Sequence, residues 1–205
     1  MLLHTLYLVA IAAEAMSAAL VAGRREMDWL GVCVIACVTA LGGGTLRDVL
    51  LGRHPLSWIE HPSYLVIVLV AALATALIAP IAKRLRTSFL VLDAIGLVVF
   101  TVIGCNIAKE LGLHWIIILV SGMVTGTFGG VLRDVLCTQI PLLFRKELYA
   151  SVSLLTGGLY MAAPHLGIDH SVGMVVAMVV GFALRMLAIR YHWEMPKFVY
   201  KDDWD

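Results

Sequence analysis

Charged residues are scarce in this chain. Asp, Glu, Lys and Arg together make up 14% of its 205 residues, whereas soluble domains carry about 25%. The formal net charge is only +1, so nothing in the composition favours a nucleic-acid partner. Hydrophobic residues reach 61%, above the roughly 45–50% of soluble domains. The composition excludes an ordinary water-soluble fold and indicates an integral membrane protein in contact with membrane lipid.

Catalytic signatures are missing as well. The sequence contains no P-loop, no H-E-x-x-H zinc motif and no G-x-S-x-G nucleophile elbow. The four cysteines fall inside apolar stretches, where a small soft side chain packs well and suitably spaced metal partners are lacking: Cys33, Cys37, Cys105 and Cys137. We therefore expect no enzymatic activity, no cofactor and no metal site.

Long apolar stretches account for most of the chain. A bilayer core about 30 Å thick requires about 20 mostly apolar residues for each helical span. Seven stretches satisfy this requirement, at residues 3–22, 29–51, 62–82, 88–107, 114–137, 147–165 and 171–190. They lack the alternation of a membrane β-barrel, and backbone groups in lipid must be paired internally, so each stretch is expected to be helical. The sequence predicts an all-α membrane protein with seven transmembrane helices in one membrane domain, residues 1–205.

Charged residues beside the apolar stretches predict on which side of the membrane each end of the chain lies. The first stretch has no basic segment before it and no small-residue cleavage site, so it is interpreted as a retained span. Alternate connections and the C-terminal tail carry ten Lys and Arg residues, against two in the other connections. Cytoplasmic loops are enriched in these residues, so we expect the N-terminus outside and the C-terminus in the cytoplasm. Arg185 is expected to extend to the cytoplasmic interface.

An internal repeat organises the sequence. An offset of 86 residues aligns "GGTLRDVLLGRHPL" (43–56) with "GGVLRDVLCTQIPL" (129–142), and nine of fourteen positions are identical. The chain divides into a three-helix repeat at 1–86, a second at 87–170, and a seventh helix with the tail at 171–205. Because three spans are an odd number, the second repeat is expected to enter the bilayer from the opposite side, as in inverted-topology transporters.

Glycines occupy matching positions in the two repeats. Gly42, Gly43 and Gly44 lie slightly past the middle of the second span, and Gly129 and Gly130 lie there in the fifth. Glycine permits a kink that turns carbonyl groups out of the helix, toward a central site or pore. The alternative is that these glycines only let helices approach closely. The neighbouring charged residues favour the first interpretation.

An arginine and an aspartate follow each glycine segment: Arg47 with Asp48, and Arg133 with Asp134. An arginine at membrane depth costs at least about 2.5 kcal/mol, so it is expected to face the bundle interior and find a carboxylate. Neighbouring residues point about 100° apart around a helix, so we expect Arg and Asp of one pair not to bond each other well.

Carboxylates elsewhere supply the expected partners. Asp93, at the depth of Arg133, is expected to pair with it, and Tyr7, which is the repeat equivalent of Asp93, is expected to accept a hydrogen bond from Arg47. Glu14 falls near the middle of the first span, where a lone carboxylate is a functional candidate. Its alternative role is that of a neutral acid hydrogen-bonded to a backbone carbonyl.

These blocks resemble the prokaryotic branch of the trimeric intracellular cation (TRIC) channel family. The resemblance rests on "GGGTLRDVLLG" and "FGGVLRDVL", preceded by "AEAMSAALVAGRREMD" and "LVLDAIGLVVFTVIG", and it covers nearly the whole chain. It implies two inverted triple-helix repeats plus a seventh helix, a homotrimer, a pore in each subunit and permeation of K⁺ and Na⁺, in a prokaryotic inner membrane. Members of this branch are also labelled glycine transporters.

Three functions remain open from the sequence. The first is a monovalent cation channel lined by the glycine segments of the second and fifth spans, with the acids favouring cations and the arginines forming gates. The second is a secondary transporter for a small zwitterion such as glycine. The third is a structural membrane protein in which glycines only pack helices, and which moves no solute.

Overall fold

The computed structural model describes residues 2–81, 85–144 and 148–193, and these residues form helices and connecting turns with no strand among them. The principal helices are α1 (Leu2–Arg24), α2 (Trp29–Leu50), α4 (Ser63–Ile78), α5 (Leu85–Glu110), α6 (Trp115–Leu136), α7 (Tyr149–Ala162) and α8 (His170–Tyr191). The short helix α3 (Ser57–Glu60) and the 3₁₀ turns η1 (Ala79–Ile81), η2 (Leu142–Phe144) and η3 (Ala163–Leu166) complete the described fold. The all-α prediction is confirmed.

Six helices in the described part of the chain are long and apolar enough to cross a membrane, and α4 reaches this length together with η1. They correspond to six of the seven predicted spans. The remaining prediction, 147–165, contains α7, which is only 14 residues long before it continues into η3. The expected seventh crossing therefore stays a prediction. Most of the C-terminal tail lies outside the described residues.

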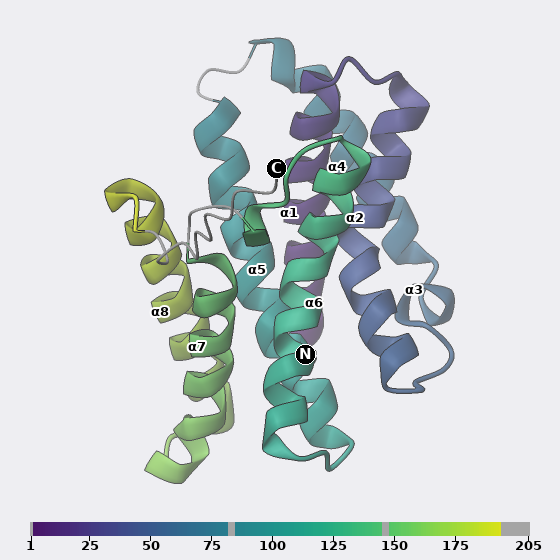
Figure 1. Ribbon diagram of the computed structural model, residues 1–205. Helices are drawn as coiled ribbons and strands as arrows, with labels where there is room; N and C mark the ends of the chain where they lie inside the picture. The colour runs from purple at the N-terminus through teal and green to yellow at the C-terminus, as the bar shows by residue number, and fades with distance from the viewer. Residues whose placement is uncertain (1, 82–84, 145–147, 194–205) are drawn as a thin grey trace, which may run out of the picture.

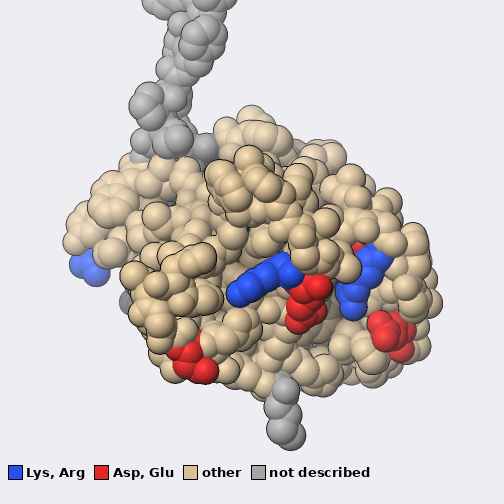
Figure 2. Space-filling view, turned by 90° about the horizontal axis from the view of Figure 1, so that it is seen from below, with Lys and Arg blue, Asp and Glu red and all other residues tan. Residues whose placement is uncertain are grey.

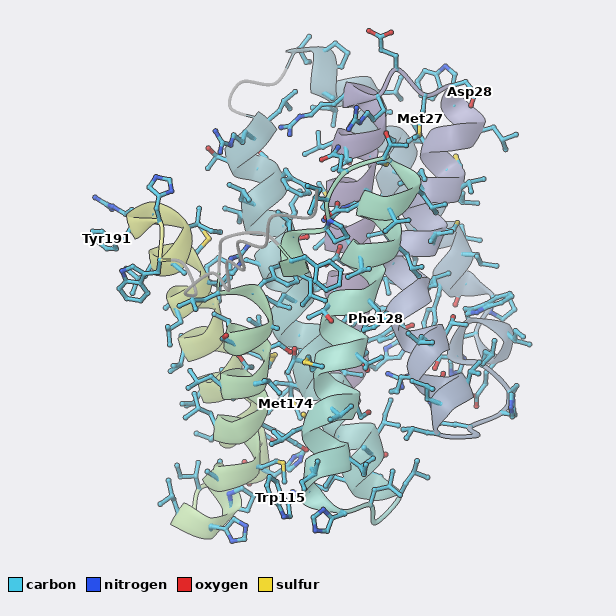
Figure 3. The ribbon with its side chains drawn as sticks, in the orientation of Figure 1. Met27, Asp28, Trp115, Phe128, Met174 and Tyr191 are labelled. Carbon is cyan, nitrogen blue, oxygen red and sulfur yellow. The ribbon has the colours of Figure 1, made fainter. Side chains whose placement is uncertain are left out.

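Successive long helices run in alternating directions along the body of the molecule (Figure 1). Asp28, directly before α2, lies at one end of the molecule, and Trp115, which begins α6, lies at the other (Figure 3). Helices α2 and α6 therefore run antiparallel, although their sequences are similar. Each starts with a side-chain cap: Asp28 accepts from the Gly31 amide at 2.7 Å, and His114 accepts from the Ile116 amide at 3.4 Å.

The turns repeat at the same 86-residue offset as the sequence. Positive φ angles occur at Glu26 and Gly112, and again at Gly52 and Thr138. Positive φ is costly for a residue with a Cβ. Glu26 and Thr138 nevertheless adopt it where their repeat equivalents are glycines, so the fold imposes this conformation and local preference does not. The turns at these positions therefore share a backbone conformation with their repeat equivalents.

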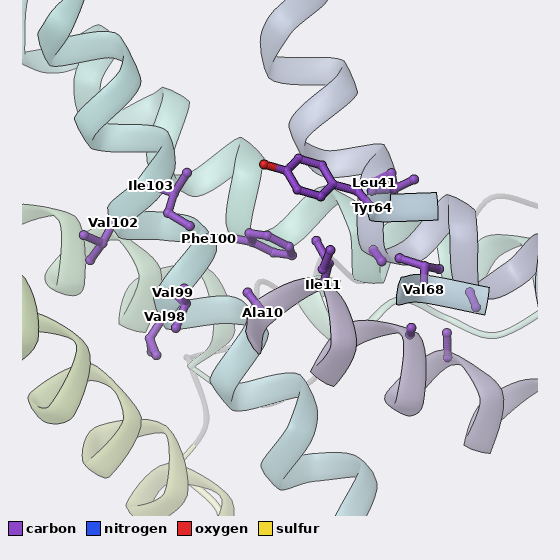
Figure 4. Close-up of a cluster of buried hydrophobic side chains, with 14 of the residues drawn as sticks. Ala10, Ile11, Leu41, Tyr64, Val68, Val98, Val99, Phe100, Val102 and Ile103 are labelled. Carbon is purple, nitrogen blue, oxygen red and sulfur yellow. The ribbon is translucent and has the colours of Figure 1, made fainter. Parts of the chain in front are cut away.

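Helices α1 and α5 form the centre of the bundle, with most of their central residues buried. Their apolar side chains meet those of α2 and α4 in one cluster, in which Ile11, Leu41, Val68 and Phe100 converge (Figure 4). Lipid is as apolar as these side chains, so close packing stabilises the association more than removal from water does. Many apolar side chains on α2, α4, α6 and α8 remain exposed on the outside of this chain.

Candidate functional site

Helices α2 and α6 cross where the two glycine segments meet. A Cβ on Gly43 would collide with the carbonyl oxygen of Thr125, and a Cβ on Gly129 would collide with that of Thr39. These four residues are two repeat-equivalent pairs, so the crossing is symmetric. Only glycine allows the two backbones to approach this closely. Gly43 and Gly129 therefore serve packing, which is the alternative weighed for them from the sequence.

Helices α2 and α6 are continuous through the glycines, so neither helix opens there, and the expected kink stays a prediction. An opened helix would leave backbone groups unpaired at membrane depth, at a cost of several kcal/mol for each group.

Gly44 and Gly130 leave space for the arginine side chains. The guanidinium Nη2 atoms of Arg47 and Arg133 lie 3.7 and 3.4 Å from where Cβ atoms would stand on these two glycines. The side chain of each arginine therefore lies over the backbone of the glycine three residues before it, where no Cβ is in the way.

Arg133 is the centre of a fully buried group of polar side chains, which we call the Arg133 centre. Its Nη1 donates to Asp93 Oδ1 at 2.8 Å and to Ser17 Oγ at 3.2 Å, and its Nε donates to Asp134 Oδ1 at 2.8 Å. Glu14 Oε2 is 3.8 Å from the same Nη1. The predicted pair of Asp93 with Arg133 is confirmed. Charge-assisted bonds of this length are the strong ones in a low-dielectric interior.

The expectation that neighbouring Arg and Asp would not pair is wrong in both repeats. Arg47 donates through Nε and Nη2 to Asp48 Oδ1 at 2.9 and 2.8 Å, as Arg133 does through Nε to Asp134. The 100° rotation separates the Cβ atoms, but the arginine stem is long enough to bring its planar fork back to the neighbouring carboxylate. Both arginines and both aspartates are buried, as predicted.

The second oxygen of each aspartate holds the chain that follows the helix. Asp48 Oδ2 accepts from Ser57 Oγ at 2.9 Å, and Asp134 Oδ2 accepts from the Leu142 amide at 2.9 Å. The repeated Arg-Asp sequence thus connects a buried cation to the loop at the end of its helix. This bond fixes the position of the loop relative to the guanidinium.

The two arginines lie in chemically different surroundings. The repeat equivalents of Glu14 and Asp93 are Phe100 and Tyr7. Among the described residues, Arg133 pairs with carboxylates from other helices, whereas Arg47 pairs with Asp48 of its own helix. Tyr7 packs against Tyr64 and Phe100, with ring centroids 4.7 and 5.9 Å apart. The expected hydrogen bond from Arg47 to Tyr7 is not found, because the described hydrogen bonds of Arg47 all go to Asp48.

Glu14 is not the lone carboxylate that the sequence suggests. It is 2% exposed, receives a hydrogen bond from Ser17 Oγ at 3.1 Å, and lies over Gly96, where a Cβ would collide with its carboxylate. With Asp93 and Asp134 it places three carboxylates around one guanidinium. The Arg133 centre therefore carries an excess of acidic groups, whereas Arg47 has one buried acid.

Three further side chains lie beside the Arg133 centre: Phe89 and Tyr149, which the sequence did not single out, and Arg185, which it assigned to the interface. The Phe89 ring lies 4.8 Å from the Arg133 guanidinium carbon, and the Tyr149 ring lies 4.7 Å from that of Arg185. Arg185 is fully buried, so its expected extension to the interface is wrong. Asp93 Oδ2, Arg133 Nη2 and the Tyr149 hydroxyl have no hydrogen-bond partner among the described residues. A signal for Phe89 existed, because it precedes Asp93 by four residues and shares its helix face.

Two cavities approach the arginines from opposite ends of the bundle. We call the first the Phe89 cavity; its volume is about 570 Å³ and its lining includes Val21, Arg24, Phe89, Leu90 and Gln139. We call the second the Arg47 cavity; its volume is about 340 Å³ and its lining includes the repeat equivalents of those residues, Ile107, Glu110, Leu3, His4 and Arg53. The two cavities therefore occupy equivalent places in the two halves.

The cavities differ in how they reach the charged centres. Arg47 itself lines the Arg47 cavity, whereas the Phe89 cavity is lined by Asp134 but not by Arg133. The end of the molecule that holds the start of α1 and the α2–α4 connection is seen in Figure 2, where basic and acidic groups lie side by side near the middle of a mostly uncharged face. The entrance at this end is mixed in charge.

A separate polar network joins α5, α7 and α8. The Tyr160 hydroxyl donates to Asn106 Oδ1 at 2.7 Å and lies 2.9 Å from His170 Nε2. Asn106 Nδ2 in turn donates to Glu110 Oε1 at 2.7 Å, and Glu110 lines the Arg47 cavity. No sequence pattern connects these residues, which lie on three different helices.

Comparison with known proteins identifies relatives along the whole chain. A family model described as "Glycine transporter" matches residues 4–80 and again 90–165. The "UPF0126 inner membrane protein YadS" of Escherichia coli is 38% identical over 200 residues, which cover 97% of both chains. The "UPF0126 membrane protein YvgT" of Bacillus subtilis is 32% identical over 199 residues, again 97% of both chains.

Solved channel structures are similar as well. The TRIC trimeric intracellular cation channel orthologue from Rhodobacter sphaeroides is 33% identical, with a TM-score of 0.89 over 93% of this chain and 98% of that one. A prokaryotic TRIC channel in 0.5 M KCl is 30% identical, with a TM-score of 0.88 over 95% and 99%. These relatives are named as channels or membrane proteins. The chain therefore belongs to the prokaryotic TRIC channel family of integral membrane proteins, whose family model carries the description "Glycine transporter".

Proposed function

We propose that the chain is a channel for monovalent cations, chiefly K⁺ and Na⁺, with a route between its two halves in each subunit. The observation that carries this proposal is the similarity to solved TRIC cation channels over nearly the whole chain, at 33% identity and a TM-score of 0.89.

The cavities support a route through the subunit. The Phe89 cavity and the Arg47 cavity enter from opposite ends, and each is lined by one member of an Arg-Asp pair. Between them lie buried apolar side chains of α1 and α5. We infer that this is a closed route, in which Arg47 and Arg133 act as gates at the ends of the apolar section, and in which movement of α2 against α6 would open it.

The charges of the site support cation selectivity. Glu14, Asp93 and Asp134 outnumber the guanidinium of Arg133, and Asp48 neutralises that of Arg47. Buried acidic excess lowers the energy of a cation in a low-dielectric route and raises that of an anion. Gly42, Gly43, Gly44, Gly129 and Gly130 are proposed to let α2 and α6 slide or bend at their crossing, and not to provide an opened helix.

The topology belongs to the same proposal. We infer two inverted three-helix repeats at 1–86 and 87–170, a seventh helix from 171, and assembly into a homotrimer with the N-terminus outside and the C-terminus in the cytoplasm of a prokaryotic inner membrane. The family model's one match in each half, the antiparallel α2 and α6, and the equivalent cavities all support the repeat. The exposed apolar faces of the single chain leave surface for other subunits and lipid.

Ion flux from proteoliposomes tests the function. Purified protein in vesicles loaded with KCl should release K⁺ faster than protein-free vesicles and much faster than it releases chloride. Glu14→Gln should reduce the preference for K⁺ over chloride, because it removes an acid from the Arg133 centre. The matched control is Glu26→Gln in the exposed α1–α2 turn, which should leave the preference unchanged.

The carrier alternative is tested in the same vesicles. Saturable uptake of radiolabelled glycine, without K⁺ release, would replace the channel proposal with that of a secondary transporter for a small zwitterion. The similar solved structures are described as cation channels, so they do not favour this alternative. Neither flux would indicate a structural protein.

A further inference from the structure

Phe89 separates the Phe89 cavity from the buried Arg133 centre. Its ring lines the cavity on one side, and the Arg133 guanidinium lies 4.8 Å from the ring centroid on the other. The ring is 7% exposed and Arg133 is completely buried. Arg24, which also lines the cavity, places its guanidinium carbon 5.9 Å from the same ring. The ring is therefore in contact with one cation in the cavity and one below it.

The position of Phe89 follows from α5. Phe89 and Asp93 are four residues apart, so they lie on one face of the helix, one turn from each other. Asp93 holds Arg133 through a 2.8 Å bond, and Phe89 covers the same guanidinium one turn nearer the cavity. An aromatic face binds a guanidinium most strongly where water is excluded. These contacts hold the ring in its covering position.

The other half of the chain provides an internal comparison. The repeat equivalent of Phe89 is Leu3, a smaller and partly exposed side chain that lines the Arg47 cavity. There the arginine itself takes part in the cavity lining. The two cavities are thus equivalent in position, but only one is closed over its arginine, and the difference coincides with an aromatic ring in place of leucine.

We propose that the Phe89 side chain is a gate that closes the route over Arg133, and that the opposite end has no covering ring over Arg47 because Leu3 stands at the equivalent position. This inference rests on the proposed function for its effect on ion flow. The ring blocks the route while it remains against Arg133. Displacement of the ring connects the Phe89 cavity, which Asp134 already lines, with Arg133 and with the carboxylates of Glu14 and Asp93 below it.

A reciprocal exchange tests the gate. In single-channel recordings, Phe89→Leu should raise the open probability about tenfold, equivalent to about 1.4 kcal/mol. Leu3→Phe should lower it by a comparable factor, because it adds a covering ring beside Arg47. The matched control is Phe182→Leu on α8, the same chemical change at a position that lines neither cavity. A merely destabilising change would not act in opposite directions at the two equivalent positions.

A chemical measurement separates the gate from the channel function. Methylglyoxal, a small arginine-directed reagent, should modify Arg133 in Phe89→Leu and not in the parent, as read by peptide mass spectrometry. Equal modification in parent and variant, or currents unchanged by Phe89→Leu, would overturn the gate. Absence of current in the parent would overturn the proposed function, and labelling would then still decide whether Phe89 covers Arg133.

Discussion

Replacing Asp93 by Asn tests the energetics of the Arg133 centre. The change keeps the side-chain volume and removes the charge that meets Arg133 Nη1 at 2.8 Å, where both side chains are at most 1% exposed. Breaking a buried ion pair costs about 3–5 kcal/mol because the remaining charge stays buried. In the variant, Arg133 keeps Asp134 at 2.8 Å and Glu14 at 3.8 Å. We therefore expect the free energy of unfolding to fall by about 3 kcal/mol, the lower limit of that range.

The assay is equilibrium unfolding in mixed micelles, with Tyr7→Phe as the matched control. Tyr7 is the repeat equivalent of Asp93 and does not bond Arg47 in the described structure. Loss of its hydroxyl should therefore lower the free energy of unfolding by less than about 1 kcal/mol. A neutral hydrogen bond between membrane helices averages only about 0.6 kcal/mol. An Asp93→Asn cost near that value would refute the assignment of a strong buried ion pair.

Two further changes test the packing and the separate polar network. Gly129→Ala, whose Cβ would meet the Thr39 carbonyl, should destabilise the fold by about 1–3 kcal/mol, whereas Gly158→Ala, which has open space, should be neutral or slightly stabilising in the same unfolding assay. Equal effects would contradict the close crossing of α2 and α6. Tyr160→Phe removes the contacts with Asn106 and His170 and should lower stability by about 1 kcal/mol, measured by thermal unfolding in detergent; an unchanged midpoint would show that the network is not stabilising.

The sequence was sufficient for the features that depend on composition and depth. Long apolar stretches predicted the helical fold, and the shared depth of Asp93 and Arg133 predicted their ion pair. Both predictions depend on one strong physical constraint, which is that charges and backbone groups at membrane depth must find partners. The duplicated Arg-Asp segment likewise pointed to the two centres.

The features that were missed depend on side-chain reach and on neighbouring helices. The length of the arginine stem decides that Arg47 bonds Asp48, and residue spacing alone does not reveal this. Gly43 permits a kink and a close crossing, and the close crossing becomes apparent only from the position of Thr125 on α6. Arg185 was assigned to the interface from its position in the span, but it packs over Tyr149 inside the bundle.

The most direct test of cation conduction is the reversal potential of single-channel currents in a planar bilayer with a KCl gradient. The account predicts a reversal potential close to the equilibrium potential of K⁺, because acidic side chains outnumber the guanidinium at the Arg133 centre. A reversal potential close to that of chloride would contradict it.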